Sequence, residues 1–234
     1  APTLNQLYVS YPAFFYFANP NLQPEQSRGF DIGFEQPLFE DRFRFGATYF
    51  RNRIKDLINT QFDPTTFTST LVNIGSGKTY GVEAFAQARV FEQLTIRADY
   101  TYTVARDASA IAPTAAAIQA ELLRQAVEGT PQPDLLRRPR RKASLQATWK
   151  PIDKLSLSAS VVRVSGWIDG TRDFTIARYQ APGYMLVNVA GSYDLAEGVT
   201  ATARVDNLFN KQYQNPTGFR APGLAAYAGL RMTY

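Results

Sequence analysis

Residues 94–104 read LTIRADYTYTV, and apolar and polar side chains alternate along this stretch. Leu94, Ile96 and Ala98 begin one face, whereas Thr95 and Arg97 begin the other. Successive side chains of a β-strand point to opposite faces. This period of two therefore predicts a strand with one apolar and one polar face.

The same alternation recurs in ASLQATWK (143–150) and in VTATARVD (199–206). Extended along the chain, it predicts nine strands, most of them long enough to cross a membrane, which takes about 9–11 tilted residues. Their predicted ranges are 28–36, 42–53, 77–90, 94–106, 138–150, 155–168, 183–195, 198–209 and 223–234.

The predicted connections alternate between short and long. The short ones are 37–41, 91–93, 151–154 and 196–197, and the long ones are 54–76, 107–137, 169–182 and 210–222. Outer-membrane β-barrels have short periplasmic turns and long extracellular loops. The alternation therefore predicts an all-β, antiparallel transmembrane barrel portion with a periplasmic C-terminus, and it places residues 1–27 in an extracellular loop.

Composition narrows the function classes. Mean hydropathy is −0.25 and there is no apolar run of about 18 residues, so no transmembrane helix is expected. The chain has no Cys and no His, which removes thiol nucleophiles, imidazole bases and the usual zinc ligands. We expect no enzyme activity, no metal site and no cofactor. The net charge of +5 is modest and spread along the strands, so nucleic acid is not an expected partner.

An odd strand number has its own consequence. Single-chain bacterial barrels have an even number of strands, and an unpaired strand edge in lipid is costly. Nine strands that start outside the cell therefore predict a barrel whose N-terminal part is missing from this sequence or supplied elsewhere.

Within the long connection 107–137, residues 114–128 (TAAAIQAELLRQAVE) are rich in helix formers and predict a short helix.

Several motifs, in this order and spacing, resemble those of TonB-dependent receptors. They are PTLNQLY (2–8), NPNLQPEQS (19–27), GFDIGFE (29–35), YFRNRIKDLI (49–58), Asn73-Ile74-Gly75 leading to YGVEAFAQ (80–87), LLRRPRRKASL (135–145), VDNLFNKQY (205–213) and GFRAPGLAAYAGLRMTY (218–234). The sequence departs from the family at Leu224, where an Arg often follows the glycine.

The resemblance implies a 22-stranded barrel around a plug, of which residues 1–234 are the C-terminal part, without the plug domain or the TonB box. It implies an integral outer-membrane protein of a Gram-negative bacterium that imports a scarce nutrient, a ferric siderophore or cobalamin, with energy delivered by TonB. The implied partners are its own plug domain, TonB, outer-membrane lipid and lipopolysaccharide. Tyr234 would be the terminal aromatic read by the barrel-assembly machinery. The alternative is a passive porin-like channel or a structural, split-barrel subunit.

Three groups of side chains are candidates for function. Aromatic and basic residues of the outer loops are predicted to contact substrate, although aromatic residues also pack loops together; these are Tyr8, Tyr11, Phe14, Tyr16, Phe174, Tyr179, Tyr213 and Arg220. Residues expected to face the lumen could touch the plug or form ion pairs within the wall; these are Glu83, Asp99, Arg204 and Asp206.

The third group is a basic patch at the rim: Arg137, Arg138, Arg140, Arg141 and Lys142. It could bind lipopolysaccharide phosphates or an anionic substrate, or it could be a solvated rim. Alternation directs Arg138, Arg140 and Lys142 towards the lumen. Trp149 and Trp167 lie near predicted strand ends and are expected to be interfacial girdle residues.

Overall fold

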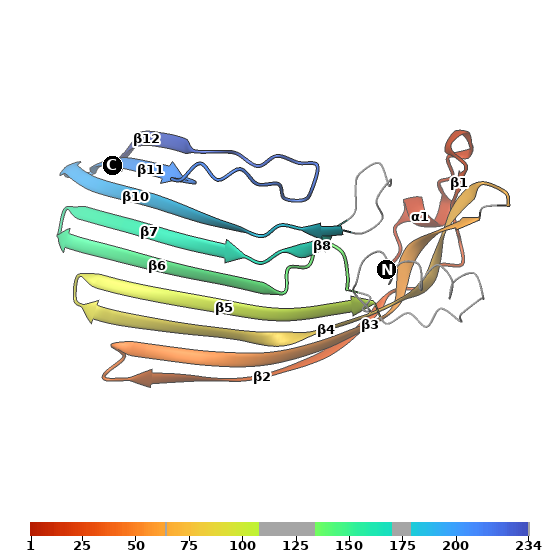
Figure 1. Ribbon diagram of the computed structural model, residues 1–234, viewed down its shortest axis with the longest axis horizontal. Helices are drawn as coiled ribbons and strands as arrows, with labels where there is room; N and C mark the ends of the chain where they lie inside the picture. Colours follow the sequence, from red (N-terminus) through yellow and green to blue (C-terminus); the bar gives the residue numbers. More distant parts are fainter. Residues whose placement is uncertain (64, 108–133, 170–178, 234) are drawn as a thin grey trace. The chain divides into compact units, whose positions relative to one another are not determined.

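The computed structural model describes residues 1–63, 65–107, 134–169 and 179–233, and nearly all of its regular structure is strand (Figure 1). The two helical segments are α1 (Leu4–Tyr8) and the 3-10 turn η1 (Pro12–Phe14). The strands are β1 (Tyr16–Phe17), β2 (Gln26–Leu38), β3 (Phe43–Asp63), β4 (Thr68–Phe91), β5 (Leu94–Asp107), β6 (Arg141–Ile152), β7 (Leu155–Val164), β8 (Trp167–Asp169), β9 (Tyr179–Ala181), β10 (Tyr184–Ala196), β11 (Val199–Asp206) and β12 (Ala225–Met232). None of the described helices has the length and apolar character needed to cross a membrane.

The nine predicted strands are confirmed. They form one sheet in the order β12-β11-β10-β7-β6-β5-β4-β3-β2, so strands that follow one another in this path are also neighbours in the sheet. The short β1 joins this sheet through β4, and β8 pairs with β9 in a separate two-stranded sheet. The short turns, at 39–42, 92–93, 153–154 and 197–198, lie together at the left of Figure 1.

The described residues fall into two compact units. Unit 1 comprises 1–31, 50–80 and 104–135, and unit 2 comprises 32–49, 81–103 and 136–234. Unit 2 contains most of the sheet and all four short turns.

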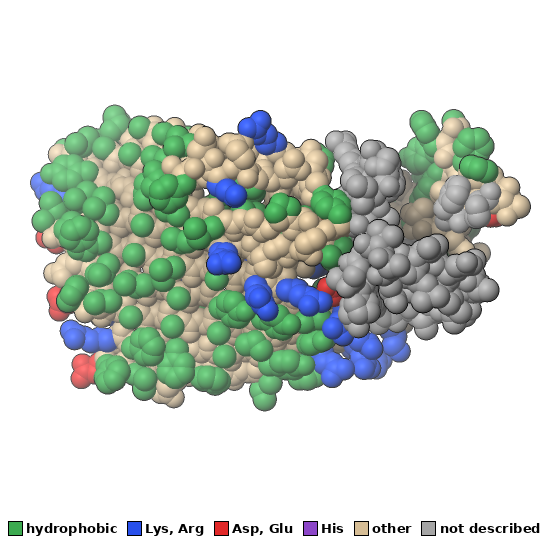
Figure 2. All heavy atoms as spheres, in the orientation of Figure 1, with side chains coloured by type: hydrophobic (Ala, Val, Ile, Leu, Met, Phe, Trp, Pro, Cys, Tyr) green, Lys and Arg blue, Asp and Glu red, His purple; other side chains and the backbone are tan. Residues whose placement is uncertain are grey.

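The pairing register of unit 2 sorts its side chains onto two faces. Asp99 lies opposite Ser144 on one face, and Leu94 lies opposite Trp149 on the other. We call these the polar face and the apolar face. Large apolar side chains stay exposed on the apolar face, as Leu230 at 62% shows. Figure 2 shows one side of the sheet with apolar side chains spread over most of its strands. An uncovered apolar sheet face is what a membrane barrel presents to lipid.

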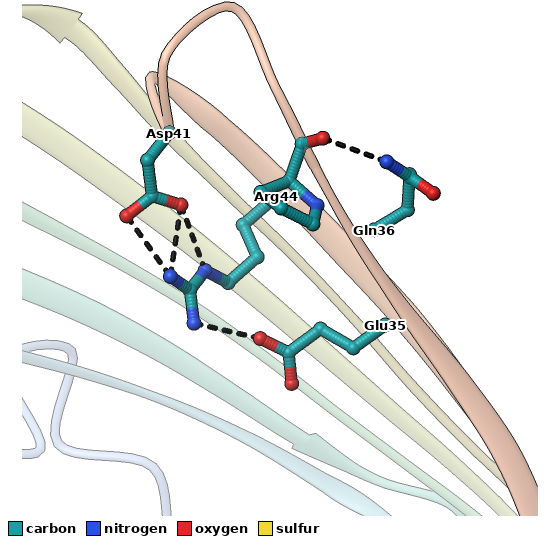
Figure 3. A network of polar contacts seen from close by, with 5 residues as sticks. Glu35, Gln36, Asp41 and Arg44 are labelled. Carbon is teal, nitrogen blue, oxygen red and sulfur yellow. Dashed lines mark hydrogen bonds and ion pairs between the residues drawn. The ribbon is translucent and has the colours of Figure 1, made fainter.

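The turn between β2 and β3 is held by a small polar network at the short-turn end (Figure 3). Nη1 of Arg44 lies 2.7 Å from Oε1 of Glu35, and Nε of Arg44 donates to Oδ1 of Asp41 at 2.9 Å. All three side chains are more than 40% exposed. Since exposed ion pairs contribute little to stability, we expect this network to add little to the free energy of unfolding.

Two predicted loops are wrong in part. The connection expected at 54–76 is mostly strand, because β3 continues to Asp63 and β4 starts at Thr68. The two strands extend well beyond the length that a membrane requires, and their outer parts lack a clean apolar alternation. The connection expected at 169–182 contains β9 and the end of β8. The helix predicted at 114–128 lies outside the described residues.

A small buried cluster lies in unit 2 where β7 gives way to β8. Val164, Trp167 and Ala181 are buried, and Tyr179 and Tyr184 pack against them. The ring of Trp167 meets that of Tyr184 edge to face, with centroids 6.2 Å apart. The expectation that Trp167 is an interfacial girdle residue is therefore wrong, because its side chain is 5% exposed and buried in this cluster. Trp149, by contrast, is 49% exposed on the apolar face.

Candidate functional site

The N-terminal segment of unit 1 exposes a group of aromatic side chains. Phe14 is 80% exposed, and Tyr8 and Tyr11 are at least half exposed. Tyr16 is only partly exposed, and its ring lies 6.1 Å from that of Tyr11. We call residues 8–17 the aromatic segment. It is a surface able to contact a flat or partly apolar ligand, because aromatic side chains offer large apolar area with few rotatable bonds.

The segment is ordered by local hydrogen bonds. Thr3 and Gln6 form a capping box at the start of α1, in which the backbone N–H of Gln6 donates to the Thr3 hydroxyl at 3.3 Å. After η1, Phe15 takes a left-handed conformation with φ 54°. The chain then turns back so that Tyr16 and Phe17 pair in parallel with Ser69 and Thr70 of β4.

Residues 19–25 attach this segment to the extended hairpin of β3 and β4. Nδ2 of Asn19 donates to the Leu71 carbonyl at 2.8 Å. The backbone N–H of Gln23 donates to Oδ1 of Asn73 at 2.8 Å, and Nδ2 of Asn73 donates to the Gln23 carbonyl at 2.9 Å. Glu25 accepts from the backbone N–H of Ile58 at 2.9 Å. We call residues 19–25 the anchor segment.

Burial reinforces the anchor segment. Leu22 and Leu71 are both buried, at 6% and 9% exposure. Asn73 also donates to the Asp56 carbonyl at 2.7 Å, where Asp56 has a φ of 57°. The motifs NPNLQPE and Asn73-Ile74-Gly75 thus meet in space, and the amide of Asn73 satisfies backbone groups of both partners.

The turn at the far end of β3 is fixed by a carboxylate. Asp63 accepts from the backbone N–H of Thr65 at 2.8 Å and from the Thr66 hydroxyl at 3.0 Å. These donors hold the pKa of the Asp63 carboxyl below its usual value, because hydrogen bonds to the charged form favour it.

In unit 2, a fully buried carboxylate joins three segments of the rim. Asp169, at the end of β8, is 0% exposed. It accepts from Nε of Arg137 at 2.9 Å, from Nε1 of Trp167 at 3.3 Å and from the backbone N–H of Thr217 at 3.0 Å. The segment before β6, the β8–β9 hairpin and the connection between β11 and β12 therefore share one acceptor. Its burial makes each donor matter, since an unpaired buried charge is costly.

A second buried polar residue organises the connection between β11 and β12. Asn207 is 4% exposed and has a φ of 51°, a conformation that Asn tolerates better than most residues. Its backbone N–H donates to Oδ1 of Asn188 at 2.9 Å, and its Nδ2 donates to the Lys211 carbonyl at 2.9 Å and to the Pro222 carbonyl at 3.2 Å. The motif VDNLFNKQY therefore closes a tight turn.

The residues of the rim basic patch have different surroundings. Arg137 is the partner of Asp169, and Nη1 of Arg138 donates to the Arg137 carbonyl at 3.4 Å. Lys142 lies beside Thr101 on the polar face, as alternation predicted, whereas Arg141 lies beside Tyr102 on the apolar face. Arg140, which precedes β6, is exposed. Contact of this patch with substrate or lipid stays a prediction.

Three of the four predicted lumen residues have partners within the sheet. Nη2 of Arg97 lies 2.7 Å from Oδ1 of Asp99. Nε of Arg204 lies 3.5 Å from Oδ2 of Asp206, and the same guanidinium lies over the Tyr227 ring at 4.4 Å. Glu83 is exposed. Contact with a plug stays a prediction for all four.

The remaining predicted substrate residues differ in exposure. Tyr179 packs on the buried cluster of unit 2, and Tyr213 lies 4.4 Å from Tyr184 between ring centroids. Arg220 is exposed and donates to Oε1 of Gln212, with its Nε at 3.0 Å. Phe174 and Tyr234 lie outside the described residues. The described residues contain no group of three or more His, Cys, Asp or Glu that could hold a metal ion.

Sequence reasoning did not single out Asp169, Asn207, Asn73 or Asn19 as individual residues. The motifs that carry the family resemblance include Asn19, Asn73 and Asn207. Their presence in these motifs could be read from the sequence, but their hydrogen-bond partners could not. Asp169 had no such signal, because its burial depends on a hairpin and two segments distant in sequence.

Comparisons with known proteins agree with this architecture. The model of the family described as "TonB dependent receptor-like, beta-barrel" matches residues 1–208. Heme/hemopexin utilization protein C of Haemophilus influenzae is 27% identical over 223 residues, which cover 85% of this chain and 27% of that protein. The probable TonB-dependent siderophore receptor PiuA of Acinetobacter baumannii is 24% identical over 225 residues, covering 92% of this chain and 28% of the relative.

Solved structures share the fold. A mutant of the ferric enterobactin receptor PfeA of Pseudomonas aeruginosa has a TM-score of 0.69 at 20% identity, covering 94% of this chain and 32% of that one. The siderophore receptor PiuA from A. baumannii has a TM-score of 0.66 at 20% identity, covering 90% and 29%. The chain thus spans less than a third of the length of these relatives.

Proposed function

Because the chain belongs to the TonB-dependent receptor-like β-barrel family, whose members are outer-membrane proteins of Gram-negative bacteria, we propose that it forms wall and rim of a receptor that imports an iron-carrying ligand by energy-coupled uptake. The observation that carries the proposal is the match of the family model over residues 1–208, together with a sheet whose apolar face stays uncovered. The rest of the receptor would supply the plug domain and the contact with TonB.

The relatives favour iron-carrying ligands. One is named for heme and hemopexin utilization and another for siderophores. Many siderophores and heme present flat or partly apolar groups to a receptor, and the aromatic segment offers suitable side chains in Tyr8, Tyr11 and Phe14. Cobalamin, the other substrate considered from the sequence, has no support from these names.

The orientation is part of the proposal. With the short turns in the periplasm, the C-terminal end of β12 lies on the periplasmic side, and the aromatic segment and the anchor segment face the outside. The chain would act in binding and transport, with no reaction of its own.

Uptake of radiolabelled iron tests the proposal. The full-length receptor that contains this chain would be expressed in cells lacking their own siderophore receptors, and a panel of ferric siderophores and heme would be offered. We expect uptake of at least one ligand that stops when an uncoupler collapses the proton gradient or when TonB is deleted. Uptake that persists under both conditions would overturn the proposal in favour of a passive channel, and binding without any ligand-dependent uptake would also contradict it.

A further inference from the structure

Two arginines stand on the face of the sheet that is otherwise apolar. Arg163 of β7 is paired with Ala143 of β6 on one side and with Met185 of β10 on the other. Arg141 of β6 is paired with Tyr102 of β5. Both arginine side chains are exposed, and among the described residues neither forms a salt bridge. A charged side chain directed at lipid is unfavourable unless it lies near the interface or meets an opposite charge.

Arg141 and Arg163 are close enough to share a ligand. Because Arg163 lies opposite Ala143, Arg141 is its diagonal neighbour on the same face, and diagonal neighbours of adjacent strands have Cβ atoms about 7–8 Å apart. Arg141 begins β6 and Arg163 is one residue from the end of β7, so both lie at the end of the sheet opposite the short turns. Figure 2 shows basic side chains among apolar ones over these strand ends.

The arginines border a groove of about 910 Å³. Its lining includes the small residues Ala143, Gly166 and Gly183, whereas Tyr100 and Met185 contribute larger apolar side chains. Lys142 and Lys211 also line the groove, and none of its lining residues is acidic. The groove therefore combines an excess of positive charge with apolar surface.

An apolar groove of about 710 Å³ adjoins the first one and shares Tyr100 and Ala143 with it. Its lining is rich in alanine, with Ala47, Ala84 and Ala98 on three neighbouring strands. Phe34 and Phe45 also line it, with ring centroids 5.9 Å apart in an edge-to-face arrangement. A trough of small residues bordered by aromatic rings, continuous with a basic cluster, matches a molecule that has an anionic head and an apolar chain.

We propose that this face binds one phosphorylated, acylated lipid of the outer leaflet, with a headgroup phosphate between Arg141 and Arg163 and an acyl chain along the two grooves. Arginine matches phosphate geometry because its planar guanidinium can donate two parallel hydrogen bonds. Lys142 and Lys211 add two further positive charges at the same groove. The site depends on the outward orientation of the long connections given under Proposed function, but it does not depend on which ligand is imported.

Native mass spectrometry of the full-length receptor tests the site. The receptor, purified in a mild detergent, would be titrated with diphosphorylated lipid A, with the same lipid after dephosphorylation, and with inorganic phosphate. The test variant is the double substitution Arg141→Gln and Arg163→Gln. The matched control is Lys150→Gln with Lys154→Gln, which removes the same charge from the opposite end of the β6–β7 hairpin.

We expect one retained lipid A on the unaltered receptor and on the control, and an apparent affinity at least ~10-fold weaker for the test variant, since two charge-assisted contacts are lost. Equal binding to the test variant and the unaltered receptor would overturn the site. Equal retention of the dephosphorylated lipid would overturn headgroup recognition, and displacement of lipid A by inorganic phosphate alone would identify a free-anion site instead.

The test variant's fold is checked by its resistance to unfolding in sodium dodecyl sulfate without heating, so a misfolded variant is recognised and replaced by the single substitution Arg163→Gln. Iron uptake by the same cells separates this proposal from the proposed function. Retained lipid A with no energy-dependent uptake would contradict the import receptor and leave the lipid site standing.

Discussion

The aromatic segment and the anchor segment are adjacent in the chain, yet their side chains behave in opposite ways. In residues 8–17 most of the large aromatic side chains are exposed, Phe14 at 80%. In residues 19–25 the side chain of Asn19 and the backbone of Gln23 are bonded to β4, and Leu22 is buried. In this chain, therefore, NPNLQPE (19–25) is a structural attachment, whereas the residues before it are available to a ligand.

Unit 2 also has buried polar residues that hold exposed segments in place. Asp169 and Asn207 are buried and fully engaged in hydrogen bonds, and both hold rim segments in place. Substitutions distinguish the two kinds of residue. Replacing a buried polar anchor should lower stability and leave ligand affinity unchanged, whereas replacing an exposed aromatic side chain should lower ligand affinity and leave stability unchanged.

The largest effect is expected for Asp169→Ala. Three donors lose their shared acceptor, and the guanidinium of Arg137 loses its partner, so the free energy of unfolding should fall by about 2–4 kcal/mol. Urea unfolding of the full-length receptor in lipid vesicles measures it. Asp153→Ala, in the exposed turn between β6 and β7, is the control and should change stability by less than about 0.5 kcal/mol. If the free energy of unfolding fell as little as in the control, Asp169 would not stabilise the three segments that it joins.

The next effect is expected for Asn73→Ala. This substitution removes two donated hydrogen bonds and one accepted hydrogen bond between β4, the anchor segment and Asp56. We expect local opening of residues 19–25 to become easier by about 1–3 kcal/mol. Hydrogen exchange measures the opening. Asn21→Ala is the matched control, because the Asn21 side chain has no hydrogen bond among the described residues, and exchange rates that are equal in both variants would contradict the anchor.

A smaller effect, on binding alone, is expected for Phe14→Ala. The side chain is exposed, so stability should change by less than about 0.5 kcal/mol. Loss of an aromatic contact should weaken the binding of the imported ligand by roughly 3–30-fold. Phe39→Ala is the control, because Phe39 is 75% exposed in the short turn between β2 and β3. Equal affinities of the two variants in a titration of the full-length receptor would remove Phe14 from the binding surface.

The smallest effect is expected for Arg44→Gln. The Arg44 side chain is exposed, as are those of its partners Glu35 and Asp41, so solvent and salt screen both ion pairs. Thermal unfolding should be unchanged within error at physiological ionic strength. A large loss of stability would show that the exposed turn network contributes as much as the buried anchors do.

The sequence was sufficient for the sheet. Alternation in stretches such as 94–104 located all nine long strands, because a membrane barrel must present apolar side chains at every second position. The alternation did not predict the parts of β3 and β4 that extend beyond the membrane. Residues 54–63 and 68–76 are strand without a regular apolar face. Backbone hydrogen bonds pair the strands wherever they run, whereas only a strand that faces lipid needs apolar side chains at every second position.

The candidate site was predicted in part. The exposed aromatic residues Tyr8, Tyr11 and Phe14 could be named, because they are aromatic side chains in a predicted outer loop. The buried partner of Arg137 could not be named, since Asp169 is brought to it by a hairpin more than thirty residues away. The outward direction of Arg141 and Arg163 followed only from the register between β5, β6 and β7.

The most direct test of the contrast between the two segments is hydrogen exchange of the full-length receptor with and without its imported ferric ligand. We expect bound ligand to slow exchange in peptides covering residues 8–17, whereas residues 19–25, already held by Asn73 and Leu71, should change little. Protection confined to residues 19–25, or absent from both segments while ligand is bound, would contradict it.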